Sequence, residues 1–178
     1  MVSDEWQNGI LVAYFIISSS TKNALKLVLQ ALKGTKVHAT QFASGALQPQ
    51  ELSAIEAFWP GHTSYKGLFA VDSGSTISVG QTIQKYSLKG KVAGGGYDLS
   101  SLTPTLLQQG FLDFTIDQQP YLQGFLPVLE MFLYHASDGL SGIADVDTGL
   151  KFITPKTVVP YNAKKSRFEG TKTSPGVS

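Results

Sequence analysis

YKGLFAVDSGSTISVGQTIQKYSLKGKVAGGGYD, residues 65–98, contains a complete strand–helix–strand unit. Its first part, Tyr65 to Asp72, is a short apolar run that predicts a strand ending on a carboxylate. ISVGQTIQKYSLKG then predicts a helix, and KVAGGGYD predicts a second strand that also ends on a carboxylate. Units of this kind build parallel sheets, in which a helix connects each strand to the next.

The alternation of strands and helices continues toward the N-terminus. The continuous apolar run Ile10 to Ile17 predicts a strand covered on both faces. A Ser/Thr cluster and leucines at helical spacing in SSSTKNALKLVLQALKG predict a capped helix, and VHATQFA alternates as a strand. PQELSAIEAFWPG predicts a second helix, because it opens with a proline, has acidic residues early, and stops at Pro60 and Gly61.

The same order continues toward the C-terminus. SSLTPTLLQQG predicts a helix, FLDFTIDQQP an extended segment, YLQGFLPVLEMFLYHASDG a helix despite Pro127, and VDTGLKFITPKTVVPYN a closing strand and turn. We therefore predict a single α/β lobe over residues 1–162, a three-layer sandwich with a mainly parallel sheet and helices on both faces. Residues 163–178 are predicted to be a flexible polar tail.

Composition and charge exclude several classes of partner. The chain has 178 residues, a net charge of +1 and no dense basic stripe, so nucleic acid is not expected as a partner. The absence of cysteine excludes disulfides, thiolate metal sites and a cysteine nucleophile, and no cofactor or metal is predicted. Asp4 and Glu5 stand before the apolar run ILVAYFIISSS, where a signal peptide would have Lys or Arg, so no signal peptide is predicted.

Polar side chains follow three predicted strands. Asp72 and Asp98 each end a strand, and Gln118 ends the extended segment in TIDQQP. Ligands of open α/β sheets bind outside the carboxyl ends of the strands, so these side chains are expected to share one site. An amide offers both a donor and an acceptor without adding charge, which suits a neutral ligand that is rich in hydroxyl groups.

The order and spacing of these motifs resemble the C-terminal half of type I periplasmic sugar-binding proteins, the ABC-transporter receptors for ribose, galactose and autoinducer-type sugars. The effector domains of LacI-type repressors are relatives. The resemblance extends over Lys22 to Asn162 and is strongest from Glu51 to Thr154. It implies one lobe of the type I fold, no enzymatic activity, a small neutral sugar as ligand, and a transporter permease as partner. It also implies a periplasmic or extracellular location, although without a signal peptide a cytoplasmic location stays open.

The resemblance assigns roles to individual residues. Asp72 in GLFAVD and Asp98 in GGGYD match carboxylates or amides that bind sugar hydroxyls, and Gln118 matches the amide before the crossover between the lobes. Tyr97 stands beside the site and offers an aromatic face for stacking on a sugar ring. No catalytic residue and no metal ligand is implied.

Two departures from the family pattern bear on function. Complete members have two lobes in about 270 to 300 residues, so this chain lacks most of the first lobe and half of the cleft. The family's arginine in the first helix of this lobe is also missing from STKNALKLVLQAL. In complete relatives the helix after the crossover packs on the first lobe. We therefore expect the helix Tyr121 to His135 either to fold back on its own sheet or to form a homodimer.

Two other functions compete with sugar binding. A relative that has lost its ligand would act as an interaction or dimerisation module. The triplets DSG, residues 72–74, and DTG, residues 147–149, are spelled like the active-site loops of aspartic proteases, where two carboxylates share a proton. The chain length and the alternation of helix and strand disfavour the protease, which would be almost entirely β.

Overall fold

The computed structural model describes residues 10–16, 26, 28–140, 142 and 144–162 of the chain. The predicted polar tail, residues 163–178, and most of the first half of the predicted first helix lie outside the described residues.

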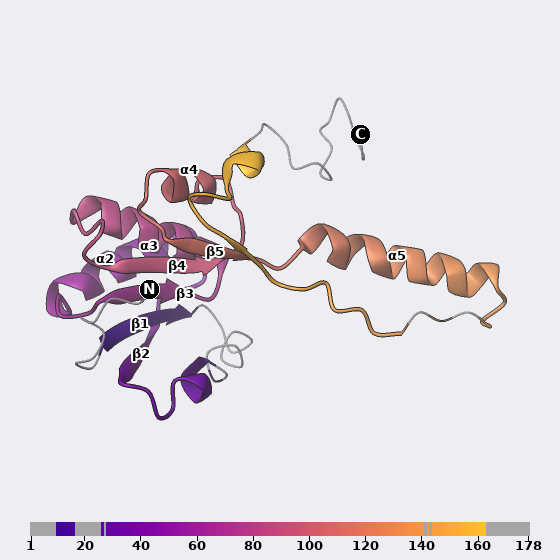
Figure 1. The fold of residues 1–178 in the computed structure, drawn as a ribbon, viewed down its shortest axis with the longest axis horizontal. Coiled ribbons are helices and arrows are strands. Elements are labelled where there is room, and N and C mark those ends of the chain that lie inside the picture. The colour runs from indigo at the N-terminus through magenta and orange to yellow at the C-terminus, as the bar shows by residue number, and fades with distance from the viewer. Residues whose placement is uncertain (1–9, 17–25, 27, 141, 143, 163–178) are drawn as a thin grey trace.

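A six-stranded sheet forms the centre of the molecule, in the order β2-β1-β3-β4-β5-β6 (Figure 1). The strands are β1 (Ile10–Ile16), β2 (Val37–Ala43), β3 (Gly67–Ala70), β4 (Ala93–Tyr97), β5 (Phe114–Asp117) and β6 (Lys151–Ile153). The first five strands pair in parallel, and β6 pairs antiparallel with β5. The prediction of an α/β fold with a mainly parallel sheet is confirmed.

Three helices of the described chain pack together and against the sheet. The helical segments are α2 (Gln48–Phe58), η2 (Trp59–Gly61), α3 (Ser73–Lys85), α4 (Thr103–Gln108), α5 (Pro120–Ala136) and η3 (Val159–Asn162). Helix α3 contacts α2, α4, β3 and β4, so it is the centre of this layer. It comes close to β4 because Gly96 has no side chain: a Cβ there would collide with the hydroxyl of Thr76 on α3.

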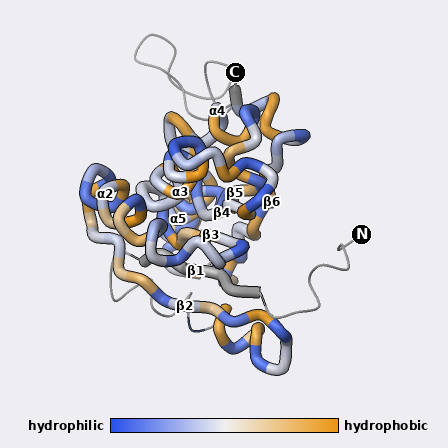
Figure 2. Tube along the Cα trace, turned by 90° about the vertical axis from the view of Figure 1, so that its left-hand side faces the viewer, coloured by the Kyte–Doolittle hydropathy of each residue, from blue (hydrophilic) through white to orange (hydrophobic). Residues whose placement is uncertain are grey.

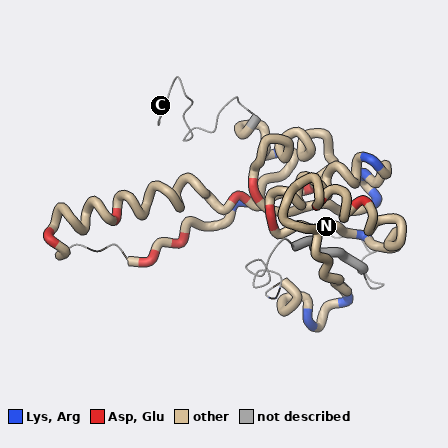
Figure 3. The backbone as a smooth tube through the Cα atoms, turned by 180° about the vertical axis from the view of Figure 1, so that it is seen from behind, with Lys and Arg blue, Asp and Glu red and all other residues tan. Residues whose placement is uncertain are grey.

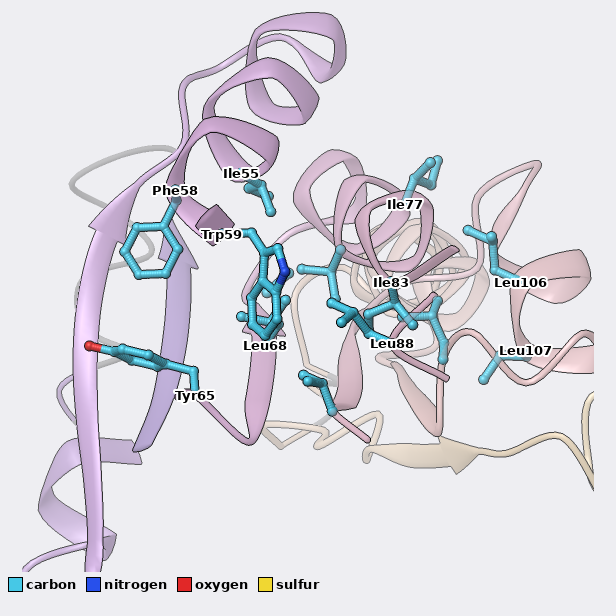
Figure 4. Packing of buried hydrophobic residues seen from close by; sticks show 14 of the residues in the cluster. Ile55, Phe58, Trp59, Tyr65, Leu68, Ile77, Ile83, Leu88, Leu106 and Leu107 are labelled. Atoms are coloured by element: carbon cyan, nitrogen blue, oxygen red, sulfur yellow. The ribbon is translucent and has the colours of Figure 1, made fainter. Parts of the chain in front are cut away.

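The hydrophobic core lies between these helices and the sheet (Figure 4). Ile55 from α2, Leu68 from β3 and Leu107 from α4 are fully buried. Trp59, just after α2, is 5% exposed and belongs to this core, so a structural role accounts for it. The opposite side of the sheet carries a row of aromatic rings from β3, β5 and β6. Phe114 stacks on Phe69, and the ring centroids of Phe114 and Phe152 are 5.7 Å apart.

Helix α5 and the described residues between 137 and 150, here together called the arm, project from the body (Figure 1). In the view turned by 90° the arm runs behind the sheet, away from the viewer (Figure 2). No residue of α5 is buried, and Phe125, Val128 and Phe132 are 48%, 62% and 67% exposed. The expectation that this helix folds back on its own sheet is therefore wrong. The chain turns away from the sheet at Gln119, whose φ is 61°, directly after β5.

The arm is acidic as well as apolar. Residues 120–150 include four acidic residues and neither Lys nor Arg, whereas basic residues are found on the body (Figure 3). A hollow of about 430 Å³ separates α5 from the returning chain near Val146. No helix within the described ranges is long and apolar enough to cross a membrane.

Candidate functional site

A cavity of about 480 Å³ lies at the carboxyl ends of β4 and β5, where the arm joins the body. Its size is within the usual range for small-molecule sites, roughly 300 to 1,000 Å³. Polar groups, tyrosines and prolines line it together. The lining residues are Ser73, Asp98, Leu99, Ser100, Pro104, Asp117, Gln118, Gln119, Pro120, Tyr121, Lys151 and Tyr161.

The structure brings two of the predicted site residues into direct contact. Gln118 Nε2 donates a hydrogen bond of 2.7 Å to Asp98 Oδ1. The other oxygens of this pair, Asp98 Oδ2 and Gln118 Oε1, are also hydrogen-bond acceptors. One carboxylate and one amide therefore lie side by side, and a carboxylate is the stronger acceptor of the two.

The backbone of Asp98 is held in a conformation that a non-glycine residue rarely adopts, with φ 69°. Two bonds from β5 hold it there. The Asp98 N–H donates to the carbonyl of Ile116 at 2.8 Å, and the Thr115 hydroxyl donates to the carbonyl of Asp98 at 2.8 Å. Strain of this kind costs about 1–3 kcal/mol and is typical of functional sites, because the surrounding structure must enforce it.

The two adjacent glutamines at the joint have different tasks. The carbonyl of Gln118 accepts hydrogen bonds from Gln123 Nε2 at 2.7 Å and from the Thr148 hydroxyl at 3.2 Å. These hydrogen bonds tie helix α5 and the returning segment of the arm to one residue. Gln119 makes the left-handed turn into α5, and its N–H donates to Asp117 Oδ1 at 2.9 Å. The hydrogen bonds to its carbonyl fix the backbone of Gln118, and the bond to Asp98 fixes its side chain.

Asp72 has a structural task at the start of α3. Its Oδ1 accepts the Ser75 N–H at 2.8 Å, which caps the helix. The side chain is buried and does not line the cavity, although its neighbour Ser73 does. Burial raises the pKa of Asp72; the hydrogen bonds from Ser75 oppose this shift, and the charge of Asp98 adds to it. The ligand contact by Asp72 stays a prediction.

Tyr97 is half-buried at the end of β4 and does not line the cavity either. Its N–H donates to the Thr76 hydroxyl at 2.9 Å, so its backbone is tied to α3. Stacking of Tyr97 on a ligand stays a prediction.

Sequence patterns missed several residues that line the cavity. Asp117 is one position before Gln118, and regular alternation would place it on the opposite face; β5 ends at Asp117, however, so the alternation does not continue. Lys151 enters because it pairs with Asp117 across the antiparallel strands. Its Nζ lies 5.4 Å from the ring centroid of Tyr161, which comes from η3. No sequence motif identifies Lys151 as a cavity residue. Only the antiparallel pairing of β6 with β5 places it there.

The two protease-like triplets are explained by local turns. Asp72 caps α3, and Asp147 accepts the N–H of Gly149 at 2.8 Å within its own turn on the exposed arm. Gly149 has φ 76°, a conformation that favours glycine. Across the described chain, no group of three His, Asp or Glu side chains is arranged to hold a metal ion.

Comparison with known proteins shows the family. The sequence profile of the periplasmic binding protein domain matches residues 16–136, and the chain belongs to this family. The chain is 44% identical over 174 residues to the xylose/arabinose-binding protein XylF of Sulfolobus acidocaldarius, a match that covers 94% of this chain and 43% of the relative. It therefore spans less than half of that relative's length.

Solved structures of solute-binding proteins share the fold. One from Agrobacterium radiobacter, in complex with D-arabinose, superposes with a TM-score of 0.75 at 22% identity and covers 85% of this chain and 52% of its own. Another, from Burkholderia graminis and also in complex with D-arabinose, superposes with a TM-score of 0.76 at 19% identity, and the match covers 88% of this chain and 57% of the other. A third, from Agrobacterium vitis with bound D-fucose, superposes with a TM-score of 0.75 at 17% identity, and the match covers 90% of this chain and 56% of the other. The type I periplasmic-binding-protein fold is thereby confirmed.

Proposed function

We propose that the chain is the sugar-binding part of a solute receptor that serves an ABC import system. The observation that carries the proposal is the Asp98–Gln118 pair, joined at 2.7 Å in a cavity at the carboxyl edge of the sheet. Membership of the periplasmic binding protein family supports it, as does the relative named for xylose and arabinose. The ligand class that fits is a neutral pentose or a similar monosaccharide.

The chemistry of the pair suits sugar hydroxyls. A hydroxyl that donates to Asp98 Oδ2 makes a charge-assisted bond, which is stronger than one between neutral groups. A second hydroxyl donates to Gln118 Oε1. Asp72 is retained in this proposal as a third polar contact, and Tyr97 as a stacking ring. No residue acts as an acid, base or nucleophile in this scheme, so the function is binding and not catalysis.

The permease of an ABC transporter is the proposed partner of the complete receptor, in a periplasmic or extracellular compartment. Type I receptors bind by closing two lobes over the ligand and excluding water. Because this chain spans about half the length of the relatives it matches, high affinity requires a second lobe.

The arm is the surface that such a lobe would cover. Its exposed apolar side chains, Phe125, Val128 and Phe132, form a stripe along α5. Unpartnered apolar stripes of this kind mark interaction sites. The homodimer through Tyr121 to His135 is the alternative. Two arms packed side by side would bring eight acidic residues together, so the arm would have to pack on the more basic body of the other copy.

A thermal-shift screen tests the proposed ligand class. The purified wild type and an Asp98→Asn variant are each heated without ligand and with D-xylose, L-arabinose, D-arabinose or D-fucose. A ligand that binds only the folded state raises the melting temperature as its concentration rises. We expect such a rise with at least one pentose for the wild type and for the control Asp145→Asn, which changes an exposed acid on the arm. Asp98→Asn should lose the rise.

The second candidate function is a non-binding dimerisation module, which the exposed stripe on α5 favours. No shift with any sugar, together with a stable dimer in solution, would select this candidate and reject sugar binding by the chain.

A further inference from the structure

A buried polar cluster lies behind Asp72, away from the cavity. Glu51, in the first turn of α2, is 2% exposed, and Asp72 is 8% exposed. Ser44 and Ser75 are also buried, and their hydroxyls are 2.8 Å apart. Glutamates are almost never fully buried unless they are paired, so the position of Glu51 needs an explanation.

Gly74 is the residue on which the Glu51 carboxyl rests. A Cβ at position 74 would collide with Glu51 Oε2 and would lie 3.0 Å from its carboxyl carbon. Gly74 is two residues after Asp72 in the first turn of α3. The glycine of the DSG triplet therefore makes room for a second carboxyl group at the same helix end.

One oxygen of each carboxyl group has no hydrogen-bond donor. Glu51 Oε2 and Asp72 Oδ2 are both buried, and neither has a hydrogen-bond partner within the described part of the chain. Asp72 Oδ1 already takes the Ser75 N–H. A buried ionised carboxylate without a donor is costly, whereas a protonated carboxyl group becomes a donor itself.

The charges around Glu51 do not compensate a second negative charge. The Asp72 carboxylate acts on Glu51, and Asp98 acts in turn on Asp72. On the same pair of helices, Lys85 of α3 is already bonded to Glu56 of α2 at 2.5 Å, and Lys85 is at the far end of α3 from Asp72. The positive end of the α3 dipole favours one anion there, and Asp72 occupies that position. Burial first, and the Asp72 charge second, raise the pKa of Glu51 to about 7.

We propose that Glu51 is a positioning residue that holds a proton at the start of α3 and keeps Asp72 in place, so that loss of this proton loosens the β3–α3 junction. The two orphan oxygens, the cradle at Gly74 and the absence of a compensating cation among the described neighbours carry this inference. Where it concerns the ligand it rests on the proposed sugar-binding function, but the titration of Glu51 does not.

Carboxyl ¹³C NMR of the glutamate-labelled chain tests the proton directly. The Glu51 resonance is assigned by its loss in Glu51→Gln, and Glu56→Gln is the matched control, because it makes the same change on the same helix at a less buried site. We expect one glutamate to titrate near pH 7 in the wild type and in Glu56→Gln. In Asp72→Asn this titration should move to lower pH, because a neighbouring negative charge has been removed.

A titration of Glu51 in the ordinary glutamate range, near pH 4.3, would overturn the proposal. So would a midpoint that does not change in Asp72→Asn. If Glu51→Gln fails to fold, the glutamate resonance that titrates near pH 7 is followed in the wild type and in Asp72→Asn. A change of its midpoint between these two proteins still decides the question.

The pH profile of sugar affinity separates positioning from a purely structural role. If only the form with protonated Glu51 binds, the competent fraction falls about tenfold between pH 6 and pH 8, and the apparent affinity falls with it. In Glu51→Gln this dependence should vanish. A wild-type affinity that stays constant over this range would contradict the positioning role. Absence of any sugar binding would instead count against the proposed function and leave the NMR result intact.

Discussion

Raising the pH is expected to destabilise the lobe through Glu51. The pKa of this group is raised from 4.5 to about 7 in the folded chain, so the folded state binds more protons than the unfolded state between these values. The free energy of unfolding therefore falls as the pH rises through this window and levels off above it. At about 1.36 kcal/mol for each pKa unit, a gap of about 2.5 units gives a loss of roughly 3 kcal/mol. The raised pKa of Asp72 acts in the same direction.

Urea unfolding followed by circular dichroism between pH 5 and pH 9 measures this loss. The wild type and Glu56→Gln should lose stability with rising pH, whereas Glu51→Gln should lose much less, because its side chain is neutral throughout. The reasoning is refuted if the wild-type and Glu51→Gln profiles run parallel, since the proton that is lost would then belong to another group.

Three further changes test other parts of the account. Gly74→Ala should lower the free energy of unfolding by about 1–3 kcal/mol, because the added methyl group collides with the Glu51 carboxyl group. Gly124→Ala is the control on the open surface of α5, and it should instead stabilise the chain by roughly 0.5–1 kcal/mol. Urea unfolding measures both changes. Gln118→Ala should weaken sugar binding in calorimetry and leave the fold unchanged by circular dichroism, since it removes the amide bonded at 2.7 Å to the site carboxylate; undiminished affinity would contradict this role. Phe132→Ser should reduce association in analytical ultracentrifugation, because this side chain is 67% exposed on the arm; an unchanged mass distribution of a chain that otherwise associates would place the interface elsewhere.

Local patterns predicted most of the body. Apolar runs that end on carboxylates predicted the parallel strands β3 and β4, and a helix was predicted between them; α3, however, begins at Ser73 and ends at Lys85, before Gly90. The Asp98–Gln118 contact also followed from the sequence, because carboxyl ends of neighbouring parallel strands meet at one edge.

The arm could not be predicted in this way. The apolar density of α5 is typical of a buried helix, and a sequence does not say whether the covering surface belongs to the same chain. Helix α5 has no buried residue here, although its composition would fit a core.

The cluster around Glu51 also escaped sequence analysis. An acidic residue in the first turn of a helix is ordinarily a solvated group that favours the helix dipole. Its burial arises from the packing of α2 on α3 and from the space left by Gly74, both of which are tertiary features.

Isothermal titration calorimetry of the chain with D-xylose and L-arabinose, in the wild type and in Asp98→Asn, tests the central claim most directly. The account predicts saturable heat with at least one of these pentoses in the wild type and its loss in Asp98→Asn, while circular dichroism shows both proteins folded. Equal binding by the two proteins would contradict the assignment of the site to Asp98 and Gln118, and no binding by either would contradict sugar recognition by this chain.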